Sequence, residues 1–118
     1  MNTPLTLSQT KRTIRAARAS AKLDWTTRQG MYVQALQAFF LGQEDLAMLL
    51  IRDVINGNLG FESLAIKTGI PSKSLHRMLS KNGNPTSKNL FLILRALRQA
   101  DGFQIDIQIK KPVLEAKT

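Results

Sequence analysis

The side chains best suited to chemistry lie together on one face of a short predicted helix. They are polar or cationic: Ser72, Lys73, His76 and Arg77. Leu75, Met78 and Leu79 recur at i, i+3 and i+4 and form the opposite, apolar face of the same helix. Hydroxyl, ammonium, imidazole and guanidinium groups on an exposed helix face can donate hydrogen bonds to phosphates or to base edges. This pattern therefore favours a polyanion-binding surface.

The element that must position this face is the whole stretch 61–80, in which two short apolar-periodic runs flank a turn. Leu64 and Ala65 face inward in the first run, and the small Ala65 allows a second helix to cross close by. Gly69 stands where the first helix must end in a left-handed conformation, and Ile70 fills the corner. The spacing predicts a helix-turn-helix, although an ordinary helical hairpin with a solvated outer face is the alternative.

Each candidate contact has an expected role. In a helix-turn-helix the second helix lies in the major groove of DNA with its N-terminal residues toward the bases. Arg77 can bind guanine O6 and N7 with two hydrogen bonds, and Lys73 can bind a base or a phosphate. Ser72 either caps the helix or touches a base, and His76 either contacts a phosphate or a base edge. Further cations would position the duplex without reading its sequence: Lys67, Lys81 and Lys88.

The charge distribution agrees with this reading. The formal net charge of the 118 residues is +9. Residues 1–30 carry +5 and residues 61–100 carry +6, whereas residues 31–60 carry −2 and the remainder is neutral. A polyanion partner explains this concentration. A membrane surface or an acidic protein would suit the same total, and the predicted helix-turn-helix favours double-stranded DNA.

The composition gives little support to an enzyme. There is no cysteine, which suits a reducing cytoplasm, and His76 is the only histidine. We find no nucleophile paired with a base, no glycine-rich phosphate loop and no cluster of metal ligands, so we expect neither catalysis nor a cofactor. No apolar run approaches the ~20 residues of a membrane span, and the N-terminus lacks the apolar core of a signal peptide.

The chain divides into three expected parts. Residues 1–30 form a basic arm whose alanine-rich portion, 11–22, favours a marginal helix or a frayed tail. Residues 31–110 form the DNA-binding domain together with a C-terminal strand, and residues 111–118 form a tail. Trp25, the only tryptophan, is expected to dock on the core.

Two helices are predicted ahead of the motif. Thr26 or Thr27 can cap the first, and its apolar stripe is expected at i, i+4, i+7 and i+8, namely Tyr32, Leu36, Phe39 and Phe40. The second, from Glu44 to Ile55, is apolar almost all round and belongs at the centre of the core. Its acidic residues are expected to cap it, to complement its dipole or to face solvent: Glu44, Asp45 and Asp53.

After a loop at 81–85, the pattern changes twice. Thr86 or Ser87 can cap a helix that ends at Gly102 and buries one stripe: Leu90, Ile93, Leu94 and Leu97. Apolar and polar residues then alternate strictly over 103–110, which is typical of a half-buried strand. Since no second strand is evident, we expect this one to pair with its copy in a homodimer. Pairing with an N-terminal segment or with another protein is the alternative.

The motif also resembles a known family. Ala65, Gly69, Ile70 and Leu75 stand where the lambda-repressor/Cro (Xre-type) helix-turn-helix has them. Three later segments look like the HigA-like antidote proteins of bacterial toxin–antitoxin modules: 74–80 (SLHRMLS), 83–86 (GNPT) and 90–97. The resemblance covers about 32–109. Phe61 departs from the repressors, in which a glutamine often opens the motif and braces a phosphate.

The resemblance implies a mainly α, lambda-repressor-like helix-turn-helix domain followed by a β-strand. It further implies an antitoxin that neutralises a RelE/ParE-like toxin and represses its own operon. Two other readings stay open, namely a stand-alone phage-type or metabolic repressor without a toxin, and a protein-interaction adaptor whose helix-turn-helix is vestigial.

Overall fold

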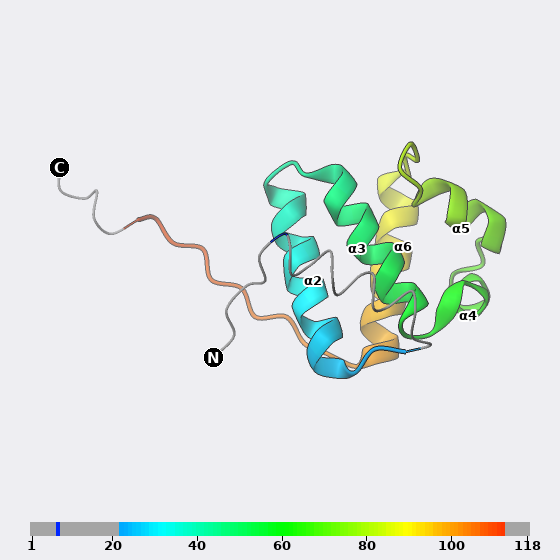
Figure 1. Cartoon of the computed structure of the whole chain (residues 1–118), viewed down its shortest axis with the longest axis horizontal. Coiled ribbons are helices and arrows are strands. Elements are labelled where there is room, and N and C mark those ends of the chain that lie inside the picture. The colour runs from blue at the N-terminus through cyan, green and yellow to red at the C-terminus, as the bar shows by residue number, and fades with distance from the viewer. Residues whose placement is uncertain (1–6, 8–21, 113–118) are drawn as a thin grey trace.

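The computed structural model describes residue 7 and residues 22–112, and these form a helical body with an extended C-terminal segment (Figure 1). The helices are α2 (Trp25–Phe40), α3 (Glu44–Asn56), α4 (Gly60–Thr68), α5 (Ser72–Met78) and α6 (Ser87–Asp101). The mainly helical fold class expected from the sequence is confirmed. The arm expected at 1–30 lies largely outside the described residues, and its boundary with residue 31 falls inside α2.

Helix α2 begins earlier than expected. Asp24 caps it by accepting a hydrogen bond from the Thr27 backbone N–H at 2.9 Å, and this bond lowers the pKa of the Asp24 carboxyl. The expectation that Thr26 or Thr27 caps the helix is therefore wrong, because both residues already lie inside it. A side-chain oxygen one residue before the helix satisfies a backbone donor that the first turn cannot satisfy itself.

The buried face of α2 also differs from the expected stripe. Tyr32 is buried and Phe39 is half-buried, but Leu36 is exposed and the Phe40 side chain is 93% exposed. The buried positions of α2 are instead Met31, Tyr32, Ala35 and Ala38. The two alanines let the neighbouring α3 approach closely. Leu36 and Phe40 lie outside the core, whereas Phe39 packs partly against it.

Helix α3 lies at the centre of the body, as predicted. Its buried apolar residues join those of α2, α4, α5 and α6 in one core, whose least accessible members are Met31, Leu50, Ile51, Val54, Ile55, Leu64, Leu75, Leu79, Ile93 and Leu97. Glu44 and Asp45 occupy its first turn as expected. Asp53 does not face solvent, because its side chain is completely buried.

Helix α6 follows the sequence expectation at both ends. The Thr86 hydroxyl accepts the Asn89 N–H at 3.1 Å, and the chain leaves the helix at Gly102. Ile93 and Leu97 are buried while Leu90 and Leu94 are half-buried.

No strand is assigned within the described residues, so the expected C-terminal strand is not observed. Residues 103–112 instead run as an extended chain along α2 and out past the body (Figure 1). In the described structure they make no backbone hydrogen bond. A strand is defined by such bonds to a neighbour, and none of the described residues supplies them to this segment.

Candidate nucleic-acid interface

The turn between α4 and α5 is built from local hydrogen bonds. The Thr68 hydroxyl donates to the Leu64 carbonyl at 2.8 Å and accepts the Ile70 N–H at 3.2 Å. Gly69 has φ +76° and its N–H returns to the Ala65 carbonyl at 2.8 Å. This left-handed residue ends α4 where the sequence predicts, because a side chain is disfavoured in that conformation.

Helix α5 presents a charged face and buries an apolar one. Leu75 and the following Leu79 are fully buried. The exposed side chains of the helix include Lys73, His76 and Arg77. The structure thus brings these three predicted contact residues together on the solvent side of the second motif helix. Because the apolar residues are fixed in the core, the orientation of the charged face is fixed as well.

The C-terminal end of α5 is held by the loop that follows and by α3. The Arg52 side chain donates from Nη1 to the Leu79 carbonyl at 3.1 Å, and the Ser80 hydroxyl donates to the Arg77 carbonyl at 2.7 Å. Gly83 packs so closely against this end that a Cβ there would lie 2.3 Å from the Met78 carbonyl oxygen. Only glycine fits such a close backbone approach.

The remaining predicted contact residues lie at the start of α5 and on the elements before and after it. Lys67 is exposed in the last turn of α4, Lys81 is exposed in the loop after α5, and Lys88 is exposed in the first turn of α6. Ser72 is half-buried as the first residue of α5 and makes no capping hydrogen bond there, so the capping role considered for it is wrong. Its remaining expected role is a base contact.

One contact within the motif was not expected from the sequence. The His76 imidazole stacks on the Phe61 ring, with 3.9 Å between ring centroids and 20° between ring planes. Phe61 is almost fully buried in the first turn of α4, whereas His76 is exposed. No periodicity argument links these positions, because they lie on different helices and meet only when the turn has folded.

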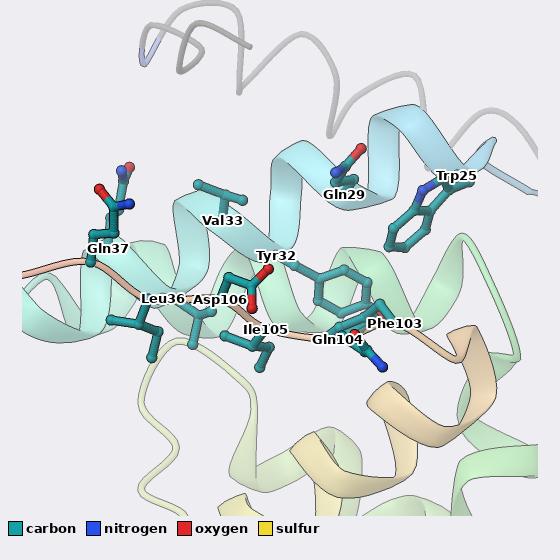
Figure 2. Close-up of a pocket in the computed structure, with 12 residues that line it drawn as sticks. Trp25, Gln29, Tyr32, Val33, Leu36, Gln37, Phe103, Gln104, Ile105 and Asp106 are labelled. Carbon is teal, nitrogen blue, oxygen red and sulfur yellow. The ribbon is translucent and has the colours of Figure 1, made fainter. Parts of the chain in front are cut away.

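A second surface lies on the outer side of α2, away from the motif helices. The segment 103–108 and the α2 residues from Trp25 to Gln37 line a groove of about 450 Å³ (Figure 2). Phe103 anchors the segment by packing on Trp25 and Tyr32, with centroid distances of 5.9 and 4.6 Å. Beyond this anchor the isoleucines become steadily more exposed: Ile105 by 50%, Ile107 by 74% and Ile109 by 89%.

A buried polar cluster sits directly before this segment, and sequence reasoning missed it. The Asp101 carboxylate, at the end of α6, accepts hydrogen bonds from Arg28 (2.6 Å), Tyr32 (2.7 Å) and Asn58 (3.1 Å). Arg28 also donates to the Leu23 carbonyl. Burial raises the pKa of the Tyr32 hydroxyl far above its usual range, and the hydrogen bond to Asp101 raises the pKa of Arg28. The cluster ties both ends of the domain together.

Two features are absent from the described part of the chain. Residues 7 and 22–112 contain no group of three or more acidic, histidine or cysteine side chains arranged to hold a metal ion. None of the helices described here combines the length and the apolar character that crossing a membrane requires.

No protein-family model, curated protein or solved structure matches this chain. The assignment of a function therefore depends on the geometry of the candidate site.

Proposed function

We propose that this protein is a sequence-specific, double-stranded-DNA-binding transcriptional regulator that uses α4 and α5 as a helix-turn-helix. The proposal rests on the two different faces of α5, one apolar and one cationic. Its apolar residues are locked in the core, while Lys73, His76 and Arg77 project from the exposed face. A short helix set across a glycine turn, with a cationic outer face, suits the major groove of DNA.

Each contact then has a role. Arg77 binds guanine O6 and N7 and carries most of the sequence preference. Lys73 adds a base or phosphate contact and Ser72 touches a base edge. Cations on the neighbouring elements bind phosphates and set the register of the duplex: Lys67, Lys81 and Lys88. The net charge of +6 on residues 61–100 supplies the long-range attraction.

The C-terminal segment supports a homodimer. Its alternating isoleucines are largely exposed, and its backbone makes no hydrogen bond in the described structure. We propose that 103–109 becomes a β-strand by pairing antiparallel with the same segment of a second copy, which satisfies both backbones and covers both apolar faces. Two copies would then present two α5 helices to a palindromic operator.

The biological frame rests on the resemblance of residues 32–109 to HigA-like antidote proteins. We propose a cytoplasmic antitoxin that neutralises a RelE/ParE-like toxin and represses its own operon. A stand-alone repressor shares the DNA-binding proposal but has no toxin, and the adaptor alternative lacks DNA binding altogether.

The DNA-binding proposal is tested by selecting duplexes from a random pool and titrating salt. We expect a recovered palindromic sequence and an affinity that falls with a log–log slope of about −0.9 per phosphate contact. Arg77→Ala should cost about 1–3 kcal/mol against the preferred base and relax the preference there. The matched control Lys88→Ala should weaken all sequences alike. No selected sequence, or equal losses on selected and scrambled DNA for Arg77→Ala, would remove the base-reading role.

The antitoxin frame needs a separate experiment. The small gene adjacent to this one, expressed alone, should arrest growth, and co-expression of this protein should restore it. A harmless neighbour, or no neighbour, would leave the stand-alone repressor as the better reading.

A further inference from the structure

We infer that Phe61 is a positioning residue for DNA binding, which holds the His76 imidazole so that its N–H edge contacts one backbone phosphate. This inference rests on the proposed function and adds a residue and a contact to it. Its starting point is the stack between the two rings, at 3.9 Å and 20°.

The stack leaves the useful part of the imidazole free. The two nitrogens of imidazole make their hydrogen bonds in the plane of the ring, and at least one of them carries an N–H that donates. In this structure Phe61 covers one face of the ring, and His76 is nevertheless exposed. A side chain held by its face therefore keeps its donor edge available to a partner. A histidine on an open helix surface would instead lose rotational freedom on binding.

The rigidity of the stack comes from Phe61. Its side chain is only 5% exposed and is part of the hydrophobic core, which also contains the fully buried Leu64. Because the Phe61 ring is fixed in the core, it cannot move with the imidazole and gives it a rigid surface to stack on. The stacked rings are in close van der Waals contact, and this contact favours one orientation of His76 before any DNA arrives.

The position of Phe61 decides which part of the DNA the imidazole meets. Phe61 lies in the first turn of α4, the first helix of the motif. In helix-turn-helix docking the first helix crosses the sugar–phosphate backbone, and the second helix lies in the groove. An imidazole drawn from α5 onto α4 is therefore on the backbone side of the recognition helix. Lys73 and Arg77, which make no such contact with α4, remain for the groove.

The stack itself can be observed without DNA. His76 is the only histidine, so its ring protons are unambiguous in an NMR spectrum. In the full-length protein we expect them to be displaced by the ring current of Phe61 and to show cross-relaxation with its ring protons. Phe61→Leu, which keeps an apolar side chain, should abolish both signatures, and Phe61→Tyr should retain them. Ring protons of His76 that resemble those of a free histidine in the wild type would overturn the inference.

The effect of the stack on DNA affinity is measured with a double-mutant cycle on selected and scrambled duplexes. A hydrogen bond to a charged phosphate predicts that His76→Ala weakens binding about tenfold on both duplexes. Phe61→Leu should produce much of the same loss, the double variant should lose little more than His76→Ala alone, and Phe61→Tyr should bind like the wild type.

The outcomes separate this inference from the proposed function. Additive losses would show that Phe61 acts through the fold of α4 and does not position His76. A loss confined to the selected duplex would assign His76 to a base and not to a phosphate. Either result overturns the inference. A wild type that binds no DNA removes the proposed function and this inference together. Wild-type binding with an additive cycle removes the inference alone.

Discussion

Replacing Tyr32 with Phe removes one hydroxyl from the buried cluster around Asp101. The Tyr32 hydroxyl donates to Asp101 Oδ2 at 2.7 Å, and Arg28 and Asn58 hold the same carboxylate. A hydrogen bond to a charged group contributes about 1.5–3 kcal/mol to stability. Because two partners of Asp101 remain in the variant, we expect the lower end, a loss of about 1.5 kcal/mol near neutral pH.

The effect should depend on pH in a defined direction. Burial raises the pKa of the Tyr32 hydroxyl above its usual range, whereas a tyrosine in the unfolded chain ionises at about pH 10. A raised pKa in the folded state means that the stabilisation is complete below about pH 10 and is lost progressively above it. The wild type should lose about 1.4 kcal/mol through this residue by about pH 11. The variant has no such group, so the difference between the two proteins should nearly vanish.

The assay is urea denaturation followed by far-ultraviolet circular dichroism, for both proteins at about pH 8 and about pH 11. Other groups that titrate in this range are common to both proteins and cancel in the difference. Tyr32 is the only tyrosine, so the absorbance of tyrosinate reports its ionisation directly. A tyrosine that ionises at the ordinary pH in the folded protein, or a difference in stability that is independent of pH, would refute the reasoning.

Four further substitutions test other parts of the structure. Gly83→Ala should destabilise the fold by about 1–3 kcal/mol because its Cβ would meet the Met78 carbonyl; Gly30→Ala, in α2 with open space around it, should instead stabilise by up to about 1 kcal/mol in the same thermal melts. Ile107→Pro, which removes a backbone donor from the proposed strand, should convert the dimer to a monomer by light scattering, and an unchanged dimer would place the interface elsewhere. Arg52→Met should lower the melting temperature because it leaves the Leu79 carbonyl without its side-chain partner, and an unaltered melt would show that this hydrogen bond contributes nothing.

The features that sequence reasoning predicted are those set by neighbours along the chain. The left-handed Gly69, the Thr86 cap and the apolar face of α5 all depend on residues within one or two helical turns. Such patterns are legible because helix periodicity and capping are local rules. They were sufficient to place the exposed cations of α5 on one face.

The features that it missed depend on distant partners or on competition between neighbours. Asp101 receives hydrogen bonds from residues 43 to 73 positions away, and the Phe61–His76 stack joins two helices. Neither the Asp101 cluster nor the ring stack can be recognised from the sequence of one of its segments alone. The cap of α2 was misplaced because Asp24 and the threonines after it are all good capping residues, and only the helix start decides between them.

The contacts that close the helical body come before the exposed C-terminal segment, and this affects where a protease can cut the protein. Asp101 closes the domain against α2, and the exposed segment begins only after that closure, at Gly102. Exposed extended chain is the preferred substrate of proteases, so cleavage between Phe103 and Ile105 would detach most of the proposed pairing segment and leave the helical body closed. If the proposed dimer and operator binding hold, such a cut would yield a folded monomer that keeps its α5 face but engages half an operator. Under that proposal, proteolysis would switch off regulation without first unfolding the protein.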